Sequence, residues 1–163
     1  MAGLVDPNDL MFKKFQPKTQ NRFILTVDGI PSWMIKKASR PSLKFATITL
    51  DHVNTKRKIQ GSATWDDISL TLYDPIVPSA AQACMEWARM GYESVTGRAG
   101  YADLYKKDIK IQILGPIGDK VEEWELKGCM PTEVTGGDLD WSGGDNIMEI
   151  TLGLAFDYAI LHY

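Results

Sequence analysis

The densest group of side chains able to do chemistry lies in residues 127–145, KGCMPTEVTGGDLDWSGGD. Asp138 and Asp140 alternate as the oxygen ligands of a calcium loop do. An EF-hand loop needs a glutamate at its twelfth position, and a calcium-binding solenoid needs Gly-Gly-Asp nonapeptides in tandem. Neither pattern is present, because Gly-Gly-Asp recurs here only once, after seven residues. We therefore predict two tight turns around a short strand at residues 138–141, since glycine permits positive φ and aspartate bonds its own backbone.

Cysteine and histidine are the next candidates for catalysis or metal binding. A thiol nucleophile needs a histidine beside it, and a zinc site needs four ligands at close spacing. The chain has two residues of each type, Cys84, Cys129, His52 and His162, and they are widely scattered. We expect Cys84 to pack as a small hydrophobic residue on a helix face and Cys129 to lie at a strand end. The sequence therefore predicts neither a cysteine–histidine pair nor a metal site.

Paired carboxylates and phosphate-binding loops are also lacking. Asp66 and Asp67 are adjacent in a predicted strand, so their side chains point to opposite faces and cannot work as a pair. The sequence contains neither GxxxxGK[ST] nor GxGxxG, so nothing supports nucleotide binding. We predict that the protein is not an enzyme and uses no cofactor.

Basic residues gather at Lys36–Lys37, Lys56–Lys58 and Lys106–Lys107. The whole chain has a net charge of −3, unlike the strongly basic balance of a dedicated nucleic-acid binder. No aromatic residues are interleaved with these clusters. Solvated faces or contacts between subunits are therefore favoured over direct binding of DNA.

Length and composition indicate an ordinary globular domain. The chain has 163 residues, of which 44% are hydrophobic and 24% charged. This size can bury a sizeable core without a disulfide or a metal. Two cysteines fit a reducing compartment, and the sequence shows neither a signal peptide nor a run of 18 apolar residues. We predict an N-terminal arm over residues 1–21 and a single domain over residues 22–163.

The pattern of apolar residues predicts mainly antiparallel β-structure. Period-two alternation or β-rich composition marks strands within residues 22–30, 43–50, 59–73, 108–114, 121–128 and 146–158. There is no alternation of strands with helices, so a parallel sheet is not expected. The strands should form a sandwich or barrel, and its open edges need a cover.

One segment has a helical pattern. Ser79 and Gln82 form the spacing of a capping box, and Gly91 is a typical helix end. Between them, small apolar residues recur with helical spacing. We predict a helix over about residues 79–91 that lies close on the sheet.

From Arg22 to Tyr158 the chain resembles the tail tube proteins of T4-like contractile phages. The residues that carry the resemblance are RKIQGSATWDDISLTLYD in the middle and ELKGCMPTEVTGGDLDW…NIMEITLGLAFDY near the end. Their order and spacing, rather than any one short motif, are what match. The chain departs from the family in a longer polar arm before Arg22 and in the extra C-terminal residues AILHY.

The resemblance implies a tail-tube type of fold and a structural function. It implies hexameric rings that stack into a tube, with four strands of each subunit joining a 24-strand inner barrel and the helix outside. It also implies a loop that reaches the adjacent ring. This ring-stacking loop is made of Asp51, His52, Val53, Asn54, Thr55, Lys56, Arg57 and Lys58.

The expected partners are further copies of the chain, the tail sheath, the baseplate and tail-terminator proteins, and the tape-measure protein and DNA in the lumen. Localisation would be the virion tail, with assembly in the host cytoplasm. We expect the lumen to be neutral or acidic, because a basic bore would retain DNA. We predict that Trp65, Trp124 and Trp141 lie in the core or at subunit seams. A tube subunit of a bacteriocin or type VI-like injection system, and a monomeric β-barrel module, are the alternatives.

Overall fold

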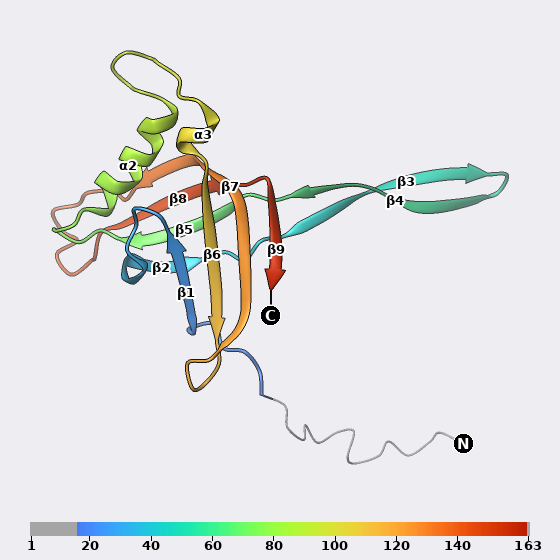
Figure 1. The fold of residues 1–163 in the computed structure, drawn as a ribbon, viewed down its shortest axis with the longest axis horizontal. Helices are drawn as coiled ribbons and strands as arrows, with labels where there is room; N and C mark the ends of the chain where they lie inside the picture. The colour runs from blue at the N-terminus through green and yellow to red at the C-terminus, as the bar shows by residue number, and fades with distance from the viewer. Residues whose placement is uncertain (1–15, 163) are drawn as a thin grey trace.

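The computed structural model describes residues 16–162, which fold mainly into antiparallel strands (Figure 1). The strands are β1 (Phe23–Val27), β2 (Ile35–Ala38), β3 (Leu43–His52), β4 (Thr55–Trp65), β5 (Ile68–Tyr73), β6 (Lys107–Leu114), β7 (Lys120–Gly136), β8 (Glu149–Ala155) and β9 (Tyr158–His162). The helical segments are η1 (Ser32–Met34), α2 (Ala80–Gly91) and α3 (Ala102–Tyr105). The predicted arm over residues 1–21 falls largely outside the described residues.

Seven of the strands form one sheet that bends into two layers. The order is β1-β6-β7-β8-β5-β2, with β9 added to β7. The first half of β7 pairs with β6 and β9, whereas residues 130–136 pair with β8. The outer layer therefore contains β1, β6, β9 and the first half of β7. The inner layer contains the second half of β7 followed by β8, β5 and β2, and Figure 1 shows its strands crossing those of the outer layer.

β7 changes layer next to a glycine. Gly128 has φ +67°, a backbone conformation that side chains other than glycine rarely adopt. A Cβ added there would lie 2.2 Å from the Asp157 Oδ2 atom. The Asp157 carboxylate is bound by Lys106 Nζ at 2.9 Å, and its backbone N–H donates to the Lys127 carbonyl. Glycine is thus required where the chain between β8 and β9 crosses β7.

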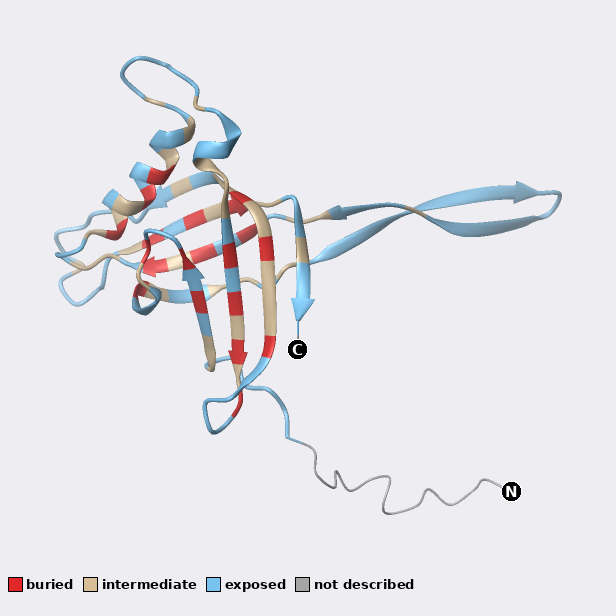
Figure 2. Cartoon of the chain, in the orientation of Figure 1, coloured by how far each residue is buried: buried red, intermediate tan, exposed pale blue. Residues whose placement is uncertain are grey.

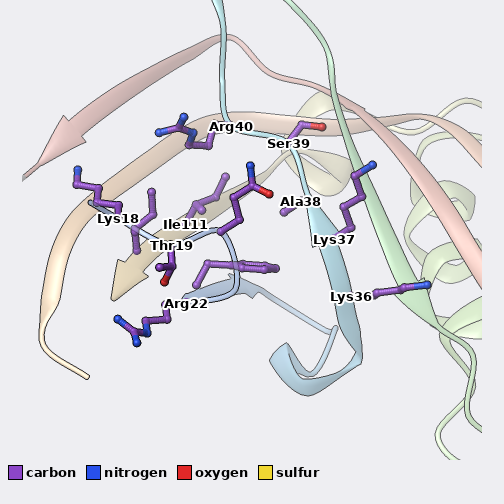
Figure 3. Close-up of a pocket in the computed structure, with 12 residues that line it drawn as sticks. Lys18, Thr19, Arg22, Lys36, Lys37, Ala38, Ser39, Arg40 and Ile111 are labelled. Atoms are coloured by element: carbon purple, nitrogen blue, oxygen red, sulfur yellow. The ribbon is translucent and has the colours of Figure 1, made fainter. Parts of the chain in front are cut away.

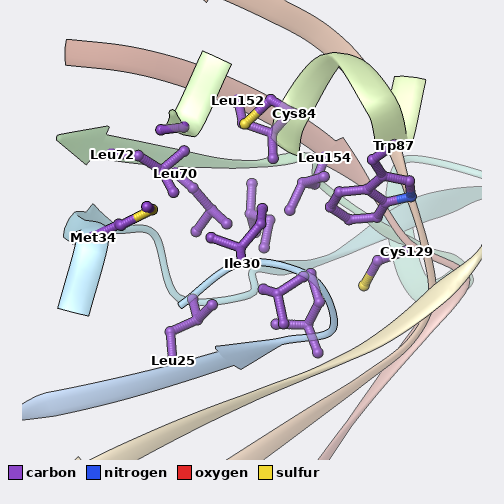
Figure 4. Close-up of a cluster of buried hydrophobic side chains, with 14 of the residues drawn as sticks. Leu25, Ile30, Met34, Leu70, Leu72, Cys84, Trp87, Cys129, Leu152 and Leu154 are labelled. Atoms are coloured by element: carbon purple, nitrogen blue, oxygen red, sulfur yellow. The ribbon is translucent and has the colours of Figure 1, made fainter. Parts of the chain in front are cut away.

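The hydrophobic core fills the space between the two layers (Figure 4). Buried residues alternate with more exposed ones along the strands, as the period-two pattern predicts (Figure 2). In β5 the buried residues are Ile68, Leu70 and Leu72, and in β8 they are Ile150, Leu152 and Leu154. These positions face β1 and β6, so the core is a layer of branched aliphatic side chains between two sheets.

α2 closes one end of this core. The Ser79 hydroxyl accepts a hydrogen bond from the Gln82 backbone N–H, which confirms the predicted N-cap. The Gln82 side chain bonds Glu86 instead of returning to Ser79, so only half of the capping box forms. Cys84 and Trp87 are buried on the sheet side, and the predicted helix is confirmed.

β3 and β4 form a separate two-stranded ribbon that projects from the body (Figure 1). Every residue of β3 is exposed, and no residue of β4 is fully buried (Figure 2). The predicted loop over residues 51–58 is shorter than expected, because strand pairing continues to His52 and Thr55. The connection consists of Val53 and Asn54, and Val53 has φ +48°.

Other element boundaries also differ from the predictions. The strand predicted over residues 59–73 is interrupted at Asp66 and Asp67, where the ribbon joins the body. The strand predicted over residues 146–158 is interrupted where the chain changes layer. The predicted strand at residues 138–141 is absent, because the β7–β8 ladder ends at Gly136 and leaves that segment without a partner.

Candidate assembly surfaces

The ribbon of β3 and β4 carries an apolar face with no partner among the described residues. Ile48 stands opposite Ile59, and Leu50 follows on the same face. These three side chains are each about half exposed. A lone two-stranded hairpin is marginally stable in water, so a ribbon of this kind needs a cover. The sequence pattern predicted the strand but not its isolation.

The tip of the ribbon is basic. Lys56, Arg57 and Lys58 follow the turn in sequence and are all exposed. Lys56 approaches the Asp51 carboxylate at 3.9 Å, with both side chains well solvated, so this pair stabilises little. The residues predicted as a ring-stacking loop therefore lie together at the far end of the ribbon.

The inner layer has two free edges. Residues 130–136 of β7 pair with β8 on one side only, and β2 pairs only with β5. No other described strand covers either edge. Unpaired edges offer rows of N–H and C=O groups that a further chain can bond. The layer can therefore be extended on both sides by other copies.

The open face of the inner layer is polar and nearly neutral. Ser69, Thr71 and Thr151 alternate with the buried aliphatic residues of β5 and β8. Lys36 donates to the Glu149 carboxylate on the same face, and this hydrogen bond raises the pKa of Lys36. Lys37 stands opposite Thr71 and Glu133 opposite Gly153, so one further cation and one further carboxylate lie on this face, which stays close to neutral.

A cavity of about 480 Å³ opens beside β2, between the two layers (Figure 3). Its floor is apolar and its rim is basic. The lining residues are Lys18, Thr19, Gln20, Arg22, Phe23, Lys36, Lys37, Ala38, Ser39, Arg40, Ile111 and Ile113. These residues come from three distant parts of the sequence, so no local pattern could have indicated the cavity.

Two of the cations at the rim form ion pairs within the subunit. Lys18 donates to the Glu122 carboxylate, and this bond lowers the pKa of Glu122. Lys36 pairs with Glu149, as described above. Within residues 16–162, Arg22, Lys37 and Arg40 form no ion pair. They leave positive charge at the mouth of the cavity.

The predicted tryptophans have three different environments. Trp65 is partly buried at the base of the ribbon and packs on Phe156 at 5.6 Å between ring centroids. Trp124 is partly buried against the core, and its indole N–H donates to the Glu122 carboxylate. Trp141 is fully exposed in the loop between β7 and β8, so it is not a core residue of the single chain. The seam placement stays a prediction.

The thiols and imidazoles do not form a catalytic site within the described residues. Burial raises the pKa of Cys84 to about 11 and that of Cys129 to about 12, so both are inert thiols. Cys129 lies inside β7 and not at a strand end as predicted. His52 is near the ribbon tip, and His162 bonds Glu125 at 3.1 Å.

Two other kinds of site are absent from residues 16–162. No cluster of three or more His, Cys, Asp or Glu side chains is arranged to hold a metal ion. No described helix has the length and apolarity needed to cross a membrane.

A comparison with family models matches residues 19–159 to the T4-like virus tail tube protein gp19. The chain belongs to this family. Tail tube protein gp19 of Enterobacteria phage T4 is 28% identical over 131 residues, covering 78% of this chain and 79% of the relative. Tail tube protein gp19 of Enterobacteria phage T6 is 27% identical over the same length. The predicted resemblance is confirmed.

Solved structures show the same fold. The tube-terminating cap of the anti-feeding prophage matches with a TM-score of 0.73 and 21% identity, covering 93% of this chain and 95% of that one. The extended sheath–tube complex of the extracellular contractile injection system PVC matches with a TM-score of 0.71 and 20% identity, covering 98% and 99%. The predicted antiparallel tail-tube fold with one main helix is confirmed.

Family membership makes the chain a structural protein of a contractile phage tail tube. Its location is therefore the virion tail. The sequence relatives are phage tail proteins, and they favour this function over the injection-system alternative. The lack of enzymatic activity stays a prediction, although it agrees with the structural role of the family.

Proposed function

We propose that the chain closes into hexameric rings whose inner layers form one continuous 24-strand barrel. The observation that carries this proposal is the pair of free edges on the inner layer. Each subunit offers four strands, so six subunits would give 24. Antiparallel order is kept at every junction, because β7 and β2 at the two ends of the layer run in opposite directions. Closing the ring removes both edges, as barrels generally do.

The ring would place the polar face of the inner layer toward the channel. α2 packs on the opposite, core side of that layer and would lie outside. A lumen lined by Ser69, Thr71 and Thr151 offers DNA few cations, so the genome would pass without strong phosphate binding. The tube then serves as the conduit for genome delivery, with the tape-measure protein in its lumen before ejection.

Stacking of rings would use the projecting ribbon. Its half-exposed apolar face and basic tip over residues 51–58 suit insertion against the adjacent ring. The arm over residues 1–21 would contact neighbouring subunits. The sheath would surround the tube, and the baseplate and a tail-terminator protein would contact its ends. Assembly would take place in the host cytoplasm before the tail joins the virion.

Electron microscopy of the purified chain tests this proposal. Negatively stained samples should show rings or tubes, and a cryo-EM map should show β7 of one copy hydrogen-bonded to β2 of the next. A solitary subunit whose inner-layer edges stay unpaired at high protein concentration would overturn the proposal. A barrel wall with strands other than β2, β5, β7 and β8 would overturn its geometry.

A further inference from the structure

We propose that the cavity beside β2 of one subunit receives the loop over residues 137–148 of the neighbouring copy in the ring, with Trp141 as its anchor. This inference rests on the proposed ring closure and names the side chains that complete each seam. Within residues 16–162 the cavity stays open, and Trp141 is fully exposed and is not part of the hydrophobic core.

Strand direction brings the two features together. The second half of β7 would run antiparallel to β2 of the next copy, so Gly136 would lie near Ile35, where β2 begins. The loop leaves β7 beyond the start of β2 and would turn back along β2 to reach Lys36 and Lys37. Neighbouring strands lie about 5 Å apart. A subunit's own loop begins three strand spacings from its own β2, or about 14 Å.

The loop is long enough to enter the cavity. Trp141 is the fifth residue after Gly136, and five extended residues span at most about 18 Å. β2 has four residues and is about 13 Å long. Trp141 can therefore reach any position along the side of the cavity that β2 forms.

The chemistry of the two surfaces is complementary. The loop carries Asp138, Asp140 and Asp145, all exposed. The mouth of the cavity carries Arg22, Lys37 and Arg40, which form no ion pair with any residue of 16–162 (Figure 3). Opposite charges at an interface favour the correct partner and fix its register.

The apolar parts also match. Trp141 is fully exposed, so the whole apolar surface of its indole is available to a partner. The floor of the cavity offers Phe23, Ile111 and Ile113. Its volume lies in the range of about 300–1,000 Å³ that proteins use for organic groups. Tryptophan and arginine are the residues most enriched among interface anchors, and an indole also attracts a guanidinium through its ring face.

The turn that presents Trp141 is held by its neighbours. The Asp140 Oδ1 atom accepts hydrogen bonds from the Ser142 backbone N–H at 3.0 Å and from the Ser142 hydroxyl at 2.8 Å. These bonds lower the pKa of Asp140, so its carboxylate keeps its charge at neutral pH. The anchor and one of its flanking charges are therefore fixed relative to each other before contact.

Disulfide trapping in the full chain tests the contact. The double variant W141C/K37C, assembled and mildly oxidised, should give a ladder of covalently joined chains on a non-reducing gel that ends at six. The control W141C/T96C places the second thiol in the exposed loop between α2 and α3 and should remain unlinked. Cys84 and Cys129 are buried and should not contribute.

Each other result overturns the inference in a distinguishable way. An internal link within single chains would mean that the loop folds onto its own subunit. A product that stops at two chains would indicate a two-fold contact, and products longer than six would place the contact between rings. Rings visible by microscopy without any ladder would refute the seam contact alone, whereas absence of rings in the unaltered protein would refute the proposed function.

Charge exchange gives a second test that does not depend on thiol geometry. The variants R22E/R40E and D138K/D145K should each raise the concentration needed for ring formation at least tenfold, and both leave the Asp140 turn intact. Combining all four substitutions should restore most of the loss, because the charges are again opposite. Failure of the combination to recover, with all variants folded by circular dichroism, would contradict the proposed pairing.

Discussion

The two-layered body and the projecting ribbon have similar alternation in sequence but opposite environments in the structure. In β5, Leu70 and Leu72 have no exposed surface, because the outer layer covers them. In β3, Ile48 and Leu50 recur with the same period, yet each is 48% exposed. Both segments form strands, but only one has a partner within its own chain.

This difference separates residues that fold the subunit from residues that assemble it. Apolar side chains in the body are covered by intramolecular packing, whose free energy is gained once per chain. In the proposed assembly, apolar side chains on the ribbon gain it only when another copy is present. Substitutions in the two regions should therefore be separable by measuring the unfolding of dilute subunits and the assembly of concentrated ones.

The largest expected effect is a core truncation compared with its counterpart on the ribbon. Leu152→Ala should lower the free energy of unfolding by about 3 kcal/mol, because it leaves a cavity between the layers. Ile48→Ala should change it by less than about 0.5 kcal/mol, as exposed sites usually do. Urea unfolding of dilute, unassembled subunits measures both. Equal losses would mean that the ribbon packs on its own body.

Substitutions on the ribbon should impair assembly without affecting the stability of the subunit. The double variant I48S/L50S should need at least a tenfold higher concentration to form tubes, equivalent to about 1.4 kcal/mol, because the apolar face no longer gains by burial. The stability of the dilute subunit should be unchanged. Sedimentation velocity across a concentration series measures assembly. T47S/T49S alters the opposite face of the same strand and serves as the control; an equal effect there would refute the assignment of faces.

A smaller effect is expected from hydrogen-bonding hydroxyls in the two regions. Ser79→Ala removes the N-cap of α2 and should cost about 1 kcal/mol of subunit stability. Thr55→Ala removes the bond from the Thr55 hydroxyl to the His52 carbonyl at the ribbon tip, and the dilute subunit should unfold as before. Thermal unfolding of the two variants makes the comparison. A loss for Thr55→Ala as large as for Ser79→Ala would show that the ribbon belongs to the cooperative unit.

The smallest effect concerns pH. The hydrogen bond from Lys18 lowers the pKa of Glu122 in the folded state. The contribution of this hydrogen bond to the free energy of unfolding is therefore fully present above the ordinary glutamate pKa of about 4.3. It is lost as the pH falls through the lower pKa that Glu122 has in the folded state. Glu122→Gln should reduce the loss of unfolding free energy at acid pH by about 1 kcal/mol or less. Unfolding midpoints between pH 3 and pH 7 measure it.

The ribbon offers the contrast for this last experiment. Asp51 faces Lys56 at 3.9 Å, and both side chains are mostly exposed. Asp51→Asn should leave the stability of the dilute subunit at pH 7 unchanged. A loss as large as that caused by Glu122→Gln at the same pH would mean that the ribbon tip is more strongly held than its exposure indicates.

Much of the fold could be predicted from local patterns. The capping residue and the small apolar face indicated α2. Period-two alternation indicated β5, β6 and β8, because a strand that is buried on one side has alternating apolar and polar residues. The break at Asp66 and Asp67 and the length of β7 could not be predicted. They depend on which strands pair across the layers, and pairing is a property of distant residues.

The candidate surfaces were less predictable than the fold. Residues 51–58 were assigned from family resemblance, but their extension as a ribbon follows from the continued pairing of β3 and β4. The cavity brings Arg22, Lys37 and Ile111 together from three segments, and no periodicity connects them. The exposure of Trp141 could not be predicted, because a tryptophan in the sequence indicates burial but not whether its own chain or a neighbouring one covers it.

β7 is a single covalent chain that belongs to both layers. In the proposed tube, a force along the axis that slides the inner layer past the outer layer must either stretch this backbone or shear the β6–β7 and β7–β8 ladders, in which many hydrogen bonds share the load at once. Tube subunits built in this way would transmit the force of tail contraction without separation of their two layers.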